Sequence, residues 1–168
     1  MLFDKEDPRY EGSFLVGPSI DPATGKVLIT AHDRPLIHTP EVTVIPGTER
    51  DGTIWGDVNQ EDGARCNKWT FDKYLTNAME NDFHIFRLAD VYLMKAECLI
   101  RTGGNNAEAT RLVNAVRERA YGNSNHNYAS VDLEKIALER KFELAWECHA
   151  RQDNIRFGTF QKRSLAEI

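Results

Sequence analysis

The sequence predicts a mainly helical protein, α+β at most, in which a loop-rich segment with short strands precedes an αα-hairpin and further helices. All six prolines and seven of the eleven glycines lie in residues 1–80. Because helix interiors exclude proline and tolerate glycine poorly, residues 81–168 can be helical throughout and the first half cannot. In the second half, apolar residues recur at spacings of three and four, which is typical of amphipathic helices.

Composition and charge exclude several function classes. The chain has 168 residues, of which 41% are hydrophobic and 28% charged, and this is typical of a globular domain rather than a disordered chain. Its net charge of −5 argues against a dominant role on nucleic acid or an anionic membrane surface, since both need a basic footprint. No window approaches the roughly 18 apolar residues of a membrane helix.

The first half predicts short strands at residues 13–16, 26–30 and 41–45. Each is rich in β-branched residues or bounded by Gly, Pro or Asp turn signals. Residues 46–68 are predicted to be an exposed connection without strands. We expect residues 1–80 to be a loop-rich part of the same domain as the helical region 81–168.

The first two predicted helices form the hairpin. A cap at Asn81 or Asp82 begins the first helix, whose apolar stripe runs to Ile100 before a glycine pair ends it. A cap at Asn105 or Asn106 begins the second, and a glycine at position 122 closes it. The link is so short that the two helices must be antiparallel.

A third helix is predicted from a cap at Ser130 through Cys148 and beyond. It places Glu139, Glu143 and Glu147 on one face. Two of these glutamates resemble the acid/base pair of a glycosidase. The alternative is that charged neighbours pair within the helix at i+3 or i+4. The expected pairs are Arg140 with Glu143, Glu147 with Arg151, and Asp153 with Arg156. The pairing interpretation is favoured, because no loop brings a substrate pocket to these carboxylates.

No cofactor and no metal are expected. The five histidines are scattered without an i, i+4 pair, and the three cysteines show no C-x-x-C spacing. Residues 57–68 begin like a calcium-binding loop but lack its glycine at position six and its glutamate at position twelve.

Aromatic side chains near the connection between the halves are the candidates for ligand binding. Flat rings in loops stack on ligands such as sugars. The candidates are Trp55, Trp69 and Tyr74. The alternative is that Trp69 and Tyr74, with Phe71, dock this segment on the helices.

Three stretches of the second half together resemble SusD/RagB-like proteins. Residues 81–97 resemble the family's "ND…xRxADVxLMxAEA" helix, and residues 114–120 its "N-x-V-R-x-R-A" segment. Residues 139–158 resemble its "ERxxELxxExxRxxDxxRxG" element, in the same order and spacing. A "DPR" segment at residues 7–9 adds a weaker similarity.

The resemblance implies a tetratricopeptide-like fold in a non-enzymatic lipoprotein of the Bacteroidetes outer membrane. Such proteins bind glycans or other polymeric nutrients at the cell surface and deliver them to a SusC-like TonB-dependent transporter. It also implies a scaffold role for charged residues at matching positions. The family has no ligand-binding motif that these positions match, so the resemblance assigns no sugar contact to any residue. These positions are Arg87, Arg117, Arg140, Glu143, Glu147, Arg151, Asp153 and Arg156.

Family members run to several hundred residues and begin with a lipidated signal sequence. We therefore expect this chain to be part of a larger protein, attached to the membrane through a lipid anchor absent from these residues. The alternative function is a free-standing tetratricopeptide-like module for protein–protein interaction. A single recognisable hairpin argues against it, since such repeats need about three units for stability.

Overall fold

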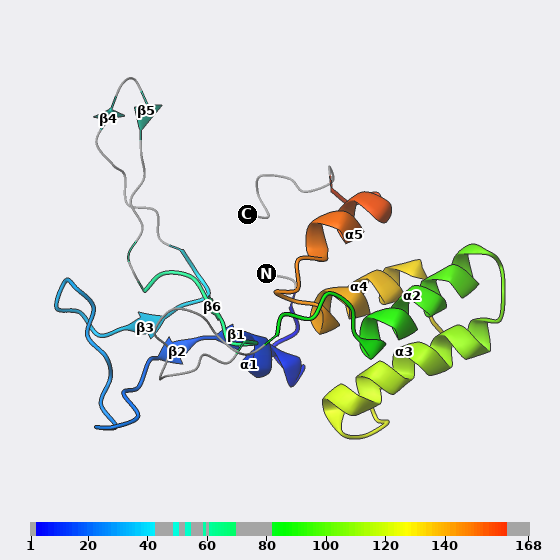
Figure 1. Cartoon of the computed structure of the whole chain (residues 1–168), viewed down its shortest axis with the longest axis horizontal. Helices are drawn as coiled ribbons and strands as arrows, with labels where there is room; N and C mark the ends of the chain where they lie inside the picture. The colour runs from blue at the N-terminus through cyan, green and yellow to red at the C-terminus, as the bar shows by residue number, and fades with distance from the viewer. Residues whose placement is uncertain are drawn as a thin grey trace. The chain divides into compact units, whose positions relative to one another are not determined.

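A computed structural model describes residues 3–42, 49–50, 53–54, 59, 61–69 and 82–160 (Figure 1). The chain divides into two compact units. One comprises Glu11–Trp69, and the other combines Met1–Tyr10 with Thr70–Ile168. The first unit is loop-rich with short strands and the second is helical, so the predicted fold class is confirmed. The first ten residues group with the helices, a feature that sequence order alone does not show.

Short antiparallel pairs make up the regular structure of the loop-rich unit. The pairs are β1 (Phe14–Leu15) with β6 (Arg65–Cys66), β2 (Gly17–Pro18) with β3 (Ile37–His38), and β4 (Glu49–Arg50) with β5 (Thr53–Ile54). Phe14 faces Cys66 in the first pair, and Gly17 faces His38 in the second. The short helix α1 (Arg9–Ser13) precedes β1, and the boundary between the two units falls within it.

The strand predictions were correct only in part. Residues 13–16 contain β1, whereas residues 26–30 form only single bridges, at Val27 and Ile29. Of residues 41–45, the first two form no strand and the rest lie outside the described residues. The prediction that residues 46–68 hold no strand was wrong, because β4, β5 and β6 all lie there. β6 depends on pairing with β1 from the start of the unit, which local sequence preference does not indicate.

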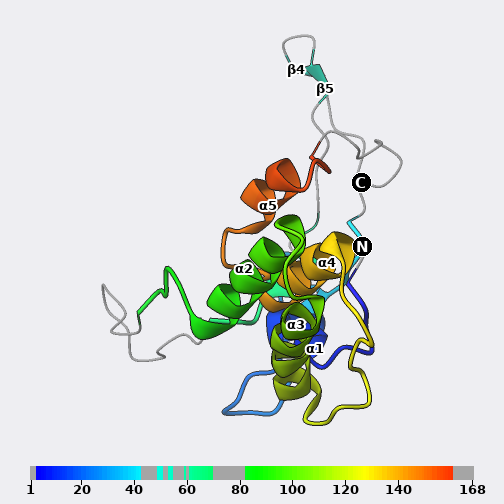
Figure 2. The same ribbon diagram turned by 90° about the vertical axis from the view of Figure 1, so that its right-hand side faces the viewer.

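Helices α2 (Leu88–Arg101) and α3 (Asn106–Tyr121) form the predicted hairpin. The Asn105 side chain accepts a hydrogen bond from the Glu108 amide at 3.1 Å, which caps α3. Gly103 and Gly122 both adopt the left-handed conformation predicted for helix ends, with φ of 65° and 69°. Figures 1 and 2 show α2 beside both α3 and α4, and α2 contacts both.

The predicted start of the first helix was wrong. The helix begins at Leu88, so neither Asn81 nor Asp82 caps it; Asn81 lies outside the described residues. The residue before it, Arg87, is fully extended, with φ −141° and ψ 162°. Its guanidinium is bound to Glu143 and Glu147.

The predicted long third helix is two helices separated by a turn. α4 (Leu133–Glu143) is capped by Asp132, whose carboxylate accepts from the Lys135 amide at 2.8 Å, and not by Ser130. Residues 144–149 form a turn in which Trp146 and Cys148 have φ of 67° and 64°. α5 (Ala150–Arg156) follows.

The core of the helical unit lies where α2, α3 and α4 meet. Its buried members come from the predicted apolar stripes, with one addition from the segment before α4. They are Leu93, Ala96, Ala109, Leu112, Val113, Val116, Val131 and Ile136. Ile85, the predicted start of the first stripe, is 73% exposed because it precedes the helix.

Candidate functional site

The helical unit holds two features that are candidates for a functional site: a buried network of ion pairs and an apolar pocket. α4 supplies the centre of the network, since Glu139, Arg140 and Glu143 on this helix are all buried. Buried charges require partners, because an unpaired ion in a protein interior loses its hydration without compensation. The partners come from elements far apart in the sequence.

Glu139 is fully buried between two arginines. Its carboxylate lies 2.6 Å from Nη1 of Arg9 and 2.7 Å from Nη1 of Arg117. Arg9 also binds Asp7 at 2.6 Å. Burial alone would lower the pKa of Arg9, but its bonds with Asp7 and Glu139 raise it above the ordinary value. The guanidinium therefore stays charged, and it ties the N-terminal segment to α4.

Arg87 joins the start of α2 to the turn after α4. Its guanidinium binds the carboxylate of Glu143 and, at 2.8 Å, that of Glu147. His84 contacts the same Glu147 carboxylate at 2.9 Å through Nε2. Burial alone would lower the pKa of Arg87, but the hydrogen bonds that it donates to both glutamates raise it. Glu147 is thus held inward by residues that precede α2.

Two further arginines join α2, α4 and α5. Arg140 lies 2.7 Å from Asp90 and 2.8 Å from Asp153. Arg156 binds Glu97 at 2.6 Å and Asp153 at 2.7 Å. Asp153 therefore accepts from both arginines, and these ion pairs join α5 to α4 and α2.

Of the three pairs predicted within one helix, only Asp153 with Arg156 forms. Arg140 binds Asp90 and Asp153 instead of Glu143. Glu147 binds Arg87 rather than Arg151, whose guanidinium lies 5.5 Å from the centre of the Phe160 ring. For Glu147 and Arg151 the prediction failed because it assumed a continuous helix, whereas a turn separates α4 from α5. Arg140 and Glu143 both lie in α4, and each is bound by charged residues from other elements instead.

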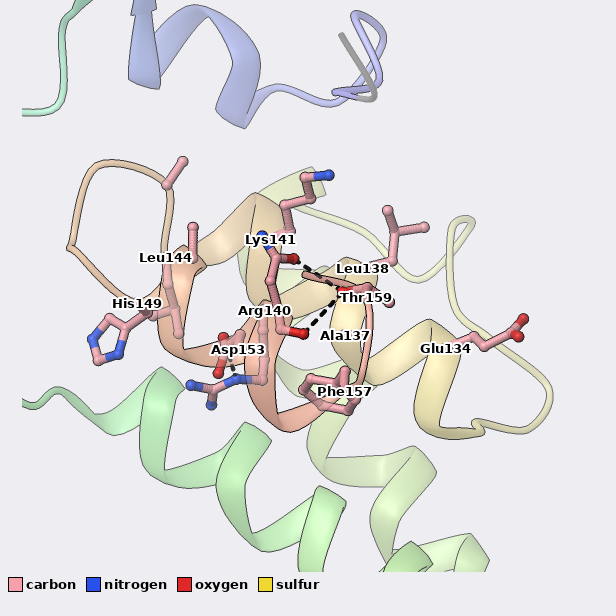
Figure 3. Close-up of a pocket in the computed structure, with 13 residues that line it drawn as sticks. Glu134, Ala137, Leu138, Arg140, Lys141, Leu144, His149, Asp153, Phe157 and Thr159 are labelled. Atoms are coloured by element: carbon pink, nitrogen blue, oxygen red, sulfur yellow. Dashed lines mark hydrogen bonds and ion pairs between the residues drawn. The ribbon is translucent and has the colours of Figure 1, made fainter. Parts of the chain in front are cut away.

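A pocket of about 410 Å³ lies between α4, the turn at 144–149 and α5 (Figure 3). Small and branched apolar side chains form most of its wall: Ala137, Leu138, Leu144, Ala145, Ala150 and Phe157. The Arg140–Asp153 ion pair also lines it. Thr159 contributes a hydroxyl that donates to the Asn154 side chain at 3.2 Å. In Figure 3, Glu134 and His149 lie at opposite ends of the pocket.

Of the three aromatic candidates, only Trp69 lies among the described residues. It is half-buried in the loop-rich unit, while Trp55 and Tyr74 lie outside the described residues. Of the pocket residues, the sequence pointed to a role only for the charged Arg140 and Asp153, and it indicated none for the partners Asp90 and Glu97. The sequence did carry one signal that Asp90 and Glu97 have partners. Acidic residues at positions 90 and 97 share the apolar face of α2, and a charge on a buried face needs a partner.

Among the residues that the structure describes, no three histidine, cysteine, aspartate or glutamate side chains gather closely enough to hold a metal ion. No helix among the described residues has the length and apolar character needed to span a bilayer.

Comparison with known proteins identifies the family. A model described as "SusD family" matches residues 2–167, almost the whole chain. The chain belongs to the SusD family. The resemblance seen in three stretches of the second half therefore extends over both units.

Two relatives of the SusD family match about half of the chain. A SusD-like protein P25 from Formosa agariphila is 48% identical over 79 residues, which are 44% of this chain and 15% of that protein. The starch-binding protein SusD from Bacteroides thetaiotaomicron is 36% identical over 81 residues, 48% of this chain and 14% of that protein. The matched segments thus span only about a seventh of each relative.

A solved structure of a SusD superfamily protein was also found to match. It comes from Bacteroides fragilis, shares 23% identity, and matches 90% of this chain and 26% of its own with a TM-score of 0.48.

Proposed function

We propose that this chain takes part in binding a glycan or another polymeric nutrient at the surface of the outer membrane. The observation that carries the proposal is the family match over residues 2–167. A relative at 36% identity is a starch-binding protein, which supports a glycan as the nutrient. The bound nutrient is then passed to a SusC-like TonB-dependent transporter, and no chemical step is needed.

The proposal places this chain inside a longer protein. Its matched segments span 15% and 14% of the two relatives, so most of each relative has no counterpart in the alignment. In the proposed assembly the longer protein carries the lipid anchor and the rest of the ligand surface. Trp55, Trp69 and Tyr74 remain candidates for stacking on the nutrient.

The buried ion pairs support a scaffold role, with no catalytic one. Glu139, Glu143 and Glu147 are each bound by at least one arginine. None of the three lines the pocket of Figure 3. A general acid needs access to a substrate, and a buried carboxylate bound to guanidinium groups lacks that access. We therefore assign the network, including Arg117, Arg140, Asp153 and Arg156, to holding the helices together.

A glycan array probed with the longer protein tests the proposed function. Binding to at least one polysaccharide and co-purification with a TonB-dependent transporter are the expected results. Changing Glu139, Glu143 and Glu147 together to Gln should lower thermal stability and leave glycans uncleaved, as in the unaltered protein. Specific loss of a hydrolytic activity in this triple variant would support an enzyme instead.

One observation favours the alternative, a module for protein–protein interaction. Five large apolar side chains at the start of α2 and just before it are 46–73% exposed. They are Phe83, Ile85, Phe86, Leu88 and Val91. Large exposed apolar side chains gathered in one short stretch of the chain favour protein contacts. Tight binding to a peptide, with no binding to any polysaccharide by the longer protein, would favour this alternative.

A further inference from the structure

We propose that the pocket between α4 and α5 is itself a binding site for one unit of a neutral glycan. The inference rests on the proposed function and adds a location within this chain. It starts from the volume of about 410 Å³, which falls within the roughly 300–1,000 Å³ of small-ligand pockets. All the lining residues lie in the helical unit, so one compact body forms the site.

The wall explains why the pocket is hollow and what it can contact. Three of its residues are alanines, at positions 137, 145 and 150, and their small side chains do not fill the space between the helices. Leu138, Leu144 and Phe157 complete an apolar surface. The C–H face of a sugar ring packs on such a surface, because both are poorly hydrated.

The polar groups around the wall suit hydroxyl groups better than an ion. Glu134 and Lys141 carry opposite charges, and the imidazole of His149 and the amide of Asn154 add hydrogen-bonding capacity. The charges of Arg140 and Asp153 are paired with each other at 2.8 Å. A site with balanced charge gives little net attraction to an anion or a cation. A neutral ring with hydroxyls on its edge uses both donors and acceptors.

The same features argue against a purely apolar ligand such as an acyl chain. Such a ligand would cover polar groups at the rim without replacing their hydrogen bonds to water, and this costs free energy. The hydroxyl of Thr159 already donates a hydrogen bond to the side-chain amide of Asn154 at 3.2 Å, so both groups are held in fixed positions. Prearranged groups of this kind improve binding, since less side-chain entropy is lost.

Filling the pocket tests the proposal. Ala150 is exposed and is the first residue of α5, so Ala150→Trp places a large ring at the pocket without altering the core. Ala107→Trp is the matched control, because Ala107 is also exposed, lies in the first turn of α3 and does not line the pocket. Both variants and the unaltered 168-residue chain are compared on an array of neutral and acidic glycans, with circular dichroism confirming that each folds.

We expect the unaltered chain to bind at least one neutral glycan and Ala150→Trp to weaken that binding about tenfold or more, because it occupies the ligand volume. Ala107→Trp should stay within about twofold of the unaltered chain. If Ala150→Trp does not fold, Thr159→Val replaces it, and the lost hydroxyl should weaken binding about two- to tenfold.

Three outcomes overturn the inference: no neutral glycan bound by this chain, binding to acidic glycans alone, or equal binding by the pocket variant and the unaltered chain. The proposed function has a separate test. It fails only if the longer protein also binds no polysaccharide. Glycan binding that Ala150→Trp leaves unchanged would place the ligand elsewhere, with Trp69 as the next residue to substitute.

Discussion

The guanidinium of Arg9 lies 2.6 Å from the carboxylate of Glu139, although 130 residues separate them in the sequence. Both side chains are almost fully buried, at 10% and 0% exposure. The same guanidinium binds Asp7 at 2.6 Å, so one arginine fixes its own segment and attaches it to α4. The N-terminal segment is thereby part of the helical unit.

Arg9→Met should lower the free energy of unfolding by about 3–5 kcal/mol, because it leaves the buried Asp7 carboxylate without its arginine and Glu139 with Arg117 alone. Arg111→Met is the control. Its pair with Glu108 is solvent-exposed and should contribute little to stability. Urea denaturation followed by circular dichroism measures both. Equal losses for the two variants would show that the Arg9 contacts do not stabilise the fold.

Stability should fall in acid, owing in part to Asp7 and Glu97. Burial alone would raise the pKa of each, but hydrogen bonds from Arg9 to Asp7, and from Arg156 and Arg101 to Glu97, hold both pKa values below their ordinary 3.8 and 4.5. A carboxyl with a lowered pKa in the folded state stabilises the protein fully above its ordinary pKa. That contribution is lost as the pH falls through the lower folded value.

Unfolding free energies measured between pH 7 and pH 2 check this. Asp7→Asn should be less stable than the unaltered chain at pH 7 and should lose less stability on acidification. The same substitution at exposed Asp82 serves as the control. A pH dependence that is the same with and without the Asp7 carboxyl would contradict the assignment.

The cap of α4 gives a test with two neighbouring residues. Asp132→Ala should cost about 1 kcal/mol, because the Asp132 carboxylate accepts from the Lys135 amide at 2.8 Å. Ser130→Ala should change stability by less than about 0.5 kcal/mol, as is usual for a surface substitution away from such features. Thermal unfolding of the two variants distinguishes them. A larger loss for Ser130→Ala would mean that α4 begins earlier than the structure shows.

The turn between α4 and α5 holds Cys148 at a φ of 64°, a left-handed conformation that strains residues with a Cβ atom. Cys148 is exposed, so Cys148→Gly removes little packing. We expect a gain of about 0.5–1 kcal/mol, since glycine adopts this conformation without steric cost. Cys98→Gly is the control: Cys98 is exposed too but lies within α2, where glycine should cost about 1 kcal/mol. Loss of stability in both variants would refute the strain at position 148.

Local patterns in the sequence predicted part of this fold well. The stripe through Leu93 and Ala96 became the core of α2, and Asn105 and Gly122 mark the ends of α3 as expected. These features depend on residues within one or two turns of each other, so the sequence carries them directly. The predicted continuous third helix failed at the turn around Trp146, where no proline or glycine signals a break.

The candidate site was harder to predict, for a physical reason. The alanines of the pocket look like ordinary helix formers, and only the separation of α4 and α5 makes them a hollow surface. The partners of Glu147 were missed because the choice between Arg87 and Arg151 depends on the direction of the chain after α4.

By itself, the sequence determined the helical class, the hairpin of α2 and α3 and, through its motifs, the family. Tertiary structure alone decided which arginine binds which carboxylate, where α2 begins and that α4 and α5 enclose a pocket. Helix periodicity and end signals arise from neighbours along the chain. Buried ion pairs and cavities arise from distances between elements, and those are set only when the apolar faces have packed.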